Sequence, residues 1–273
     1  MEKVTIRQPQ ARWSLPNLAE LWAHRDLVYF LTWRDVVVRY RQAALGVAWA
    51  VIQPVTSMVV FSVVFGGLAK LPSGGIPYPL LALAALLPWN LFSGGVQRAS
   101  TSLVGNSALL TKVYMPKLVI PLSAVLGGLV DFAVSVAVLA FMLLYYRASV
   151  TWTVLWVPAL VALATTSALA VGLWLSAVNV QYRDVQQAIP FLLQIWLYVS
   201  PVAYSAKVVP AGPWRVLYML NPMVGVIEGF RWALFGGDSP GLSVVVSIVV
   251  TAFVLASGLF YFKRTESSFA DVV

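Results

Sequence analysis

The sequence has no cysteine, a single histidine and few charged residues among its 273 positions. The lack of cysteine excludes disulfides, thiolate metal sites and a cysteine nucleophile. One histidine, His24, cannot supply a His-Glu-x-x-His zinc site, and we interpret it as a surface residue near lipid headgroups. The sequence has no G-x-x-x-x-G-K-S/T motif, which excludes a P-loop for nucleotide. We therefore expect no enzyme activity, no metal site and no cofactor bound by this chain.

Long apolar runs take up most of the chain. Apolar residues make up 60% of the sequence and charged residues 10%, and the mean hydropathy is +0.84. Such a chain cannot cover itself with a polar surface in water, so we predict an all-α integral membrane protein. A membrane-spanning helix needs about 20 apolar residues. Six runs almost free of charge predict six spans, at 45–68, 77–97, 118–146, 153–178, 186–204 and 241–262. They form a six-span bundle, 45–262, within a single transmembrane domain, 1–273.

The basic residues predict an orientation. An even number of spans leaves both termini on one side of the membrane, and that side would hold 13 of the 18 lysines and arginines. Because short cytoplasmic loops are enriched in lysine and arginine, we expect both termini in the cytoplasm. This asymmetry explains most of the net charge of +8 without a nucleic-acid partner, for which the sequence has no module.

Three further stretches are neither simple loops nor spans. Residues 13–31 mix apolar and charged side chains in a manner typical of a helix lying along the membrane interface. Residues 105–116 predict a short cytoplasmic helix that begins near Asn106 or Ser107 and ends before Pro116. Residues 208–237 are apolar but broken by prolines and glycines, which predicts short re-entrant helices dipping back from the outer face.

Four segments of the sequence resemble a known protein family. They are TWRDVVVRYRQAALGVAWAVIQPVTSMVVFSVVFGGLA, NSALLTKVYMPKLVIPLSAVLGGLVDF, VQYRDVQQAIPFLLQIWLYVSPVAYS and LNPMVGVIEGFRWALFGG, in this order along the chain. Together they resemble the membrane subunit of bacterial type-2 ABC exporters for O-antigen, teichoic acid and capsular polysaccharide. The likeness covers nearly the whole chain.

The resemblance implies a half-transporter in the bacterial inner membrane. Two copies of this chain would pair with two copies of a separate ABC ATPase, which binds ATP and Mg, to export a lipid-linked, O-antigen-like polysaccharide from the cytoplasm. The resemblance also implies that the N-terminal segment and the loop between spans two and three contact the ATPase. Two alternatives stay open: an exporter of similar build for a drug or simple lipid, and a membrane-bound transferase acting on lipid-linked sugars.

Three arginines before the first span suggest a site for the carrier lipid. Arg34, Arg39 and Arg41 are explained by topology alone, since basic residues beside a span fix its orientation. A polysaccharide on a polyprenyl diphosphate also presents two phosphates at this interface, and guanidinium groups bind phosphate in a bidentate manner. Gly46 would then let the chain turn close to the headgroup.

Two helical stripes of mixed polar and aromatic residues predict a path for sugars. Trp49, Gln53 and Thr56 share one face of the first span, and Phe191, Gln194 and Tyr198 share one face of the fifth. Aromatic rings stack on the C–H faces of sugars, and amides bond their hydroxyls. Helix packing explains the aromatic residues about as well, but explains the two glutamines less well.

Isolated charges within the apolar regions need partners. Asp131 lies deep in the third span, so its carboxyl group should be protonated, paired or hydrated, with Arg98 as one possible partner. Glu228 and Arg231 are three residues apart on a predicted helix and can pair as a clasp at the outer mouth. Contacts that couple the chain to the ATPase are assigned to six residues: Glu20, Arg25, Leu109, Leu110, Lys112 and Tyr114.

Overall fold

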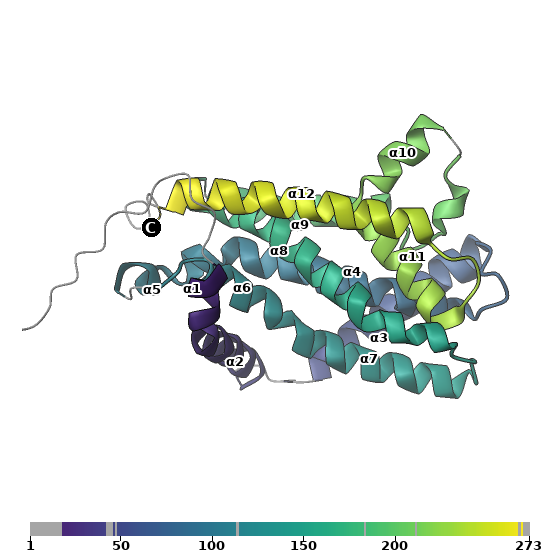
Figure 1. The fold of residues 1–273 in the computed structure, drawn as a ribbon. Coiled ribbons are helices and arrows are strands. Elements are labelled where there is room, and N and C mark those ends of the chain that lie inside the picture. The colour runs from purple at the N-terminus through teal and green to yellow at the C-terminus, as the bar shows by residue number, and fades with distance from the viewer. Residues whose placement is uncertain are drawn as a thin grey trace, which may run out of the picture.

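The protein is a bundle of long helices that lie side by side (Figure 1). The structure, a computed structural model, describes residues 18–41, 46, 48–112, 115–182, 184–210, 212–266 and 269; for 18–20, 111, 112 and 207 it describes the backbone only. Every regular element in these ranges is a helix. The prediction of an all-α integral membrane protein is therefore confirmed.

Five helical segments are long and apolar enough to cross a membrane. They are α3 (Ala48–Phe61) with its π-helical continuation to Leu68, α4 (Tyr78–Gly105), α6 and α7 (Val119–Leu126 and Gly128–Tyr145), α8 (Val157–Gln181) with the short helix Trp152–Trp156 before it, and α12 (Gly241–Thr265). These segments correspond to the first, second, third, fourth and sixth predicted spans. Each of these five predicted spans therefore coincides with a helix of sufficient length, with shifted ends.

The fifth predicted span, 186–204, is shorter than expected. Its helix, α9, covers Val185–Val199, and 15 residues at 1.5 Å each extend about 22 Å, less than the roughly 30 Å of a hydrocarbon core. The helix ends because Pro201 forces the preceding residue, Ser200, into an extended conformation, with φ −97° and ψ 152°. Among the described residues, five segments rather than six have the length of a full span.

Helix α4 forms the centre of the bundle. Most of its residues are buried, and it packs against α8, α6, α7, α11 and α3. Its contact with α8 is close because Gly172 has no side chain: a Cβ there would lie 2.5 Å from the Cβ of Ala99. The inner turns of α4 therefore have fixed neighbours on several sides, and its polar residues are held in place.

The N-terminal helix differs from the one predicted at 13–31. Residues 13–17 lie outside the described residues, and two helices follow: α1 (Leu18–Ala23) and α2 (Arg25–Arg41). Between Arg25 and Arg41 no glycine or proline interrupts the helix, so α2 continues ten residues beyond the predicted end. Val28 and Leu31 pack on Val119 of α6, which fixes α2 against the third membrane segment. The predicted end at residue 31 is therefore wrong.

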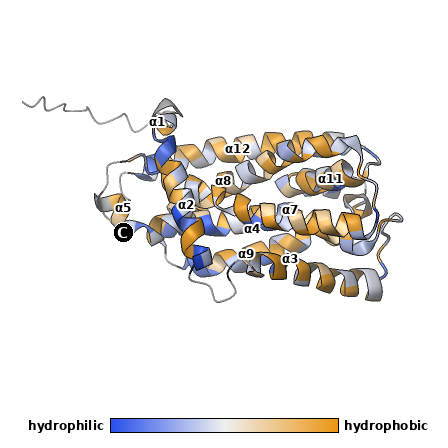
Figure 2. Ribbon diagram, turned by 90° about the horizontal axis from the view of Figure 1, so that it is seen from below, coloured by the Kyte–Doolittle hydropathy of each residue, from blue (hydrophilic) through white to orange (hydrophobic). Residues whose placement is uncertain are grey.

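One end of the bundle carries α1, α2, α5 (Ser107–Lys112) and the C-terminal end of α12 (Figure 1). Hydrophilic residues gather at this end, whereas the long helices are mainly hydrophobic (Figure 2). The Lys117 ammonium donates to the Glu266 carbonyl at 2.7 Å, which ties the end of α12 to the segment before α6. The first and last described helices thus meet at the same polar end.

The opposite end carries α10 (Pro213–Met219) and α11 (Pro222–Phe235), which occupy the stretch predicted to form short helices. Asn221 caps α11, since its side-chain oxygen accepts from the Met223 N–H at 3.0 Å. Its amide also donates to the Ser200 hydroxyl at 2.9 Å, just beyond α9. This residue joins α9 to α11. Re-entry of these helices into the membrane stays a prediction.

Candidate functional site

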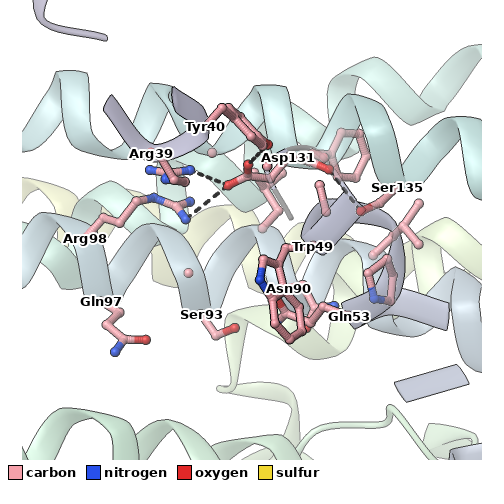
Figure 3. A pocket seen from close by; sticks show the side chains of 18 residues that line it. Arg39, Tyr40, Trp49, Gln53, Asn90, Ser93, Gln97, Arg98, Asp131 and Ser135 are labelled. Atoms are coloured by element: carbon pink, nitrogen blue, oxygen red, sulfur yellow. Dashed lines mark hydrogen bonds and ion pairs between the residues drawn. The ribbon is translucent and has the colours of Figure 1, made fainter. Parts of the chain in front are cut away.

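Three side chains from two helices, α2 and α4, meet around the Asp131 carboxylate of α7 (Figure 3). Asp131 lies in the first turn of α7, and its two oxygens accept from the Arg39 guanidinium and the Tyr40 hydroxyl, each at 2.5 Å. Arg98 of α4 approaches the same carboxylate at 3.5 Å. The predicted pairing of Asp131 with Arg98 is confirmed, but the shorter ion pair is to Arg39.

The charges of this cluster do not balance. Two guanidinium groups share one carboxylate, which leaves an excess of one positive charge. Burial, the hydrogen bond to Asp131 and the charge of Asp131 together raise the pKa of Tyr40 to about 12. Tyr40 therefore keeps its proton at neutral pH, and its hydroxyl donates a hydrogen bond to the carboxylate. The cluster is a cationic site held together by a single anion.

Two glycines make room for the Arg98 guanidinium. A Cβ at Gly128 would overlap the Arg98 Nη2 atom, and one at Gly94 would lie 3.1 Å from Nη1. Arg98 also donates from Nε to the Ala124 carbonyl at 3.2 Å, which orients the group toward α6 and α7. The position of the Arg98 guanidinium thus depends on the two glycines, which have no side chain, as much as on its bonding partners.

A cavity of about 410 Å³ opens beside the cluster. Six of the residues singled out in the sequence line it: Arg39, Gly46, Trp49, Gln53, Arg98 and Asp131. Gly46 adopts φ 45°, a left-handed conformation that glycine reaches without strain, and it stands where the chain turns between α2 and α3. Residues predicted for the headgroup, the sugar path and the intramembrane pair therefore come together in one place.

Other residues assigned to the headgroup and the sugar path lie elsewhere. Arg34 donates to Asp35 at 2.7 Å and to the Asn106 side chain at 2.8 Å, so it joins α2 to the end of α4. Arg41 is exposed at the end of α2. Neither arginine is among the described residues that line the cavity, so both lie apart from Arg39 and Gly46. Four further residues of the path are exposed away from it: Thr56, Phe191, Gln194 and Tyr198.

Sequence reasoning missed several polar residues of the cavity wall. The most regular are Asn90, Ser93 and Gln97, all on α4. They follow an i, i+3, i+7 pattern, which places them on one face of a helix. This spacing could be seen in the sequence. However, nothing in the sequence indicated which other residues this face of the helix would contact. Ser135, on α7, was missed for the same reason, whereas Tyr40 stood between two arginines whose charge drew the attention.

The residues assigned to ATPase coupling have mixed placements. Leu110 is 7% exposed and packs with Met115 and Phe262, so it is not available to a partner, and its assignment is corrected. Leu109 is half-buried. Arg25 is exposed and lies 3.9 Å from Asp26. Tyr114 lies outside the described residues, as do the side chains of Glu20 and Lys112.

The pairing of Glu228 with Arg231 is confirmed at 3.4 Å. Arg231 is buried, and its guanidinium also donates to the carbonyls of Val202 and Tyr204 at 2.9 and 2.8 Å. Glu228 accepts from the Ala206 N–H at 2.8 Å. Both charged groups thus bind the turn that follows α9, and their pairing holds this turn against α11.

Comparisons with known proteins agree with this architecture. Residues 26–235 match the ABC-2 type transporter family. The O-antigen export system permease protein RfbA of Myxococcus xanthus is 30% identical over 252 residues, covering 90% of this chain and 96% of that protein. RfbA of Klebsiella pneumoniae is 25% identical over 254 residues, 91% and 95% of the two chains. The polysialic acid transport protein KpsM of Escherichia coli is 25% identical over 250 residues, 86% and 92%. The chain therefore belongs to the ABC-2 type transporter family and is a multi-pass permease subunit.

Proposed function

We propose that this chain is the membrane subunit of an exporter that moves a lipid-linked polysaccharide out of the cytoplasm. A homodimer of the chain would assemble with two copies of a separate ATPase, which would bind and hydrolyse ATP. Relatives named for the export of O-antigen and the transport of polysialic acid support this substrate class. We further propose that both ends of the chain face the cytoplasm of a bacterial inner membrane.

The cationic cavity is the observation that carries the proposal. A carrier lipid diphosphate is an anion at the end of an apolar chain, so its site must offer positive charge next to a membrane-spanning helix. Arg39 and Arg98 supply two guanidinium groups with one carboxylate between them, beside α3. Guanidinium groups form strong, charge-assisted bonds to phosphate. Asp131 would hold both arginines in position while the site is empty, and the diphosphate would take over part of their bonding.

The sugars would pass along exposed faces of α3 and α9. Thr56 of α3 and the α9 stripe of Phe191, Gln194 and Tyr198 are exposed in the single chain. A two-fold axis would bring such faces from two copies together, so that the pair encloses a path that neither chain encloses alone. Trp49 and Gln53, which line the cationic cavity, would stand at the entrance to this path.

Replacing Arg39 by glutamine is expected to lower export by roughly ten- to a hundredfold, because a charge-assisted hydrogen bond contributes on the order of 1.5–3 kcal/mol. The measurement is surface polysaccharide in cells that depend on this chain and its ATPase. Arg41→Gln, two residues further along α2 and outside the cavity, is the matched control and should retain most of the export. Equal loss in both variants would point to topology alone and contradict the headgroup site.

Ala108 offers a test of coupling to the ATPase. It is exposed on α5, and the chain has no cysteine, so Ala108→Cys carries one reactive thiol. We expect a thiol-reactive crosslinker to join this position to the copurified ATPase. Ser239→Cys, exposed at the opposite end, should give no such product. Capture from position 239 and not from 108 would reverse the proposed orientation.

A further inference from the structure

A second cavity, of about 540 Å³, lies between α4 and α9. Its wall contains three glutamines, Gln97, Gln186 and Gln187, and the hydroxyls of Ser100 and Thr101. None of its described lining residues is charged. Volumes of roughly 300–1,000 Å³ are typical of small-molecule sites. The lining residues are therefore suited to bind a neutral, hydroxyl-rich ligand rather than an ion.

The Ser100 and Thr101 hydroxyls donate to backbone carbonyls of α4, whereas the three glutamine amides are available for bonding. The side-chain amides of the three glutamines form no hydrogen bond with another described residue, and all three side chains are exposed. Each amide offers two N–H donors and one carbonyl acceptor. Pro190 adds one more acceptor: it has no N–H, so the Gln186 carbonyl lacks the helical bond it would otherwise receive. The wall thus offers both donors and acceptors, as the hydroxyls of a sugar require.

The two cavities are neighbours. Gln97 lines both, and the next residue along α4, Arg98, belongs to the cationic cluster. In a lipid-linked glycan the first sugar is bonded directly to the diphosphate, so an anion site and a sugar site must adjoin. The cationic cavity and the glutamine-lined cavity adjoin in the same way as the diphosphate and the first sugar of such a molecule.

We propose that Gln97, Gln186 and Gln187 form a subsite for the uncharged sugar attached directly to the carrier diphosphate. This inference rests on the proposed function, because it places the phosphates beside Arg39 and Arg98. The subsite recognises a neutral pyranose through its hydroxyl and amide groups. An acidic sugar is disfavoured, since it loses hydration without gaining a counter-charge from the described wall.

The test compares three soluble probes on the purified complex of the chain and its ATPase in lipid nanodiscs. They are a short-chain prenyl diphosphate, the same compound carrying N-acetylglucosamine, and the same compound carrying glucuronic acid. Binding is measured by isothermal titration calorimetry. We expect the N-acetylglucosamine probe to bind about tenfold more tightly than the bare diphosphate, the gain of one or two net hydrogen bonds. The glucuronic acid probe should show no such gain.

Variants of the chain test the sugar subsite separately from the diphosphate site. The double variant Gln186→Leu/Gln187→Leu should lose the gain from the sugar and keep the affinity for bare diphosphate, which also shows that it is folded. Gln181→Leu, at an exposed glutamine outside the cavity, should behave as the unmodified chain. Retained discrimination in the double variant, or no preference for the sugar in the unmodified chain, overturns the subsite and leaves the diphosphate site standing. Failure of all three probes to bind overturns both.

Discussion

Gly128→Ala is expected to lower polysaccharide export by a factor on the order of thirty to a hundred, although it adds only one methyl group. That methyl group would overlap the Arg98 guanidinium, which must then shift from its place beside Asp131. The loss combines a charge-assisted phosphate contact, worth about 1.5–3 kcal/mol, with the strain of overpacking. The measurement is surface polysaccharide per copy of the chain in the membrane.

The neighbouring glycine gives a matched control. A Cβ at Gly127 would meet its nearest atom, the Ser123 carbonyl oxygen, at 3.6 Å, an ordinary contact. Gly127→Ala should therefore export nearly as well as the unmodified chain. Because Gly128 acts through Arg98, the double variant Gly128→Ala/Arg98→Gln should be no worse than Arg98→Gln alone. Additive losses in the double variant would mean that Gly128 serves helix packing and not the arginine.

The spans were predictable because a single property controls them. Burial in hydrocarbon requires long runs without charge, and five of the six runs became helices of sufficient length. The fifth predicted span, at α9, is too short for a local reason that the sequence contained: Ser200 precedes Pro201, and such a pair ends a helix. Hydropathy alone counted the residues beyond that point as part of the span.

The site was predictable only in part. Asp131 needed a partner, and the apolar surroundings made Arg98 a reasonable choice. Arg39 was not foreseen as the nearer partner because its place depends on how far α2 extends and how it lies on α6. Those depend on the packing of Val28 and Leu31 against Val119, nearly ninety residues away along the chain. No local pattern encodes such a contact.

The spacing of polar residues on α4 holds a similar lesson. Asn90, Ser93 and Gln97 share one face with Arg98 close by, yet each is a modest exception in an apolar helix. Their meaning becomes clear only when α2, α3 and α7 bring a charge cluster to the same face. A polar stripe within a predicted span is thus a sound indication of a lined cavity, and the ligand must be inferred from what faces it.

Asp131→Asn is expected to destabilise the protein by about 2–3 kcal/mol, measured as a lower thermal midpoint of the complex in detergent. Removing one member of a fully buried ion pair costs roughly 3–5 kcal/mol, because the other charge is left without a partner. The Asp131 side chain is 32% exposed, so water in the cavity offsets part of that cost. The variant leaves Arg39 and Arg98 facing each other without an anion between them.

A second substitution and an added anion make this prediction specific. Asp131→Asn/Arg98→Gln restores the original excess of one positive charge, so its midpoint should recover toward that of the unmodified chain, whereas export should stay low because one guanidinium is gone. Millimolar inorganic pyrophosphate should raise the midpoint of Asp131→Asn more than that of the unmodified chain, since two uncompensated arginines bind the anion in place of the lost carboxylate. A pyrophosphate response that is equal in both proteins would mean that the carboxylate and the diphosphate do not compete for the same arginines.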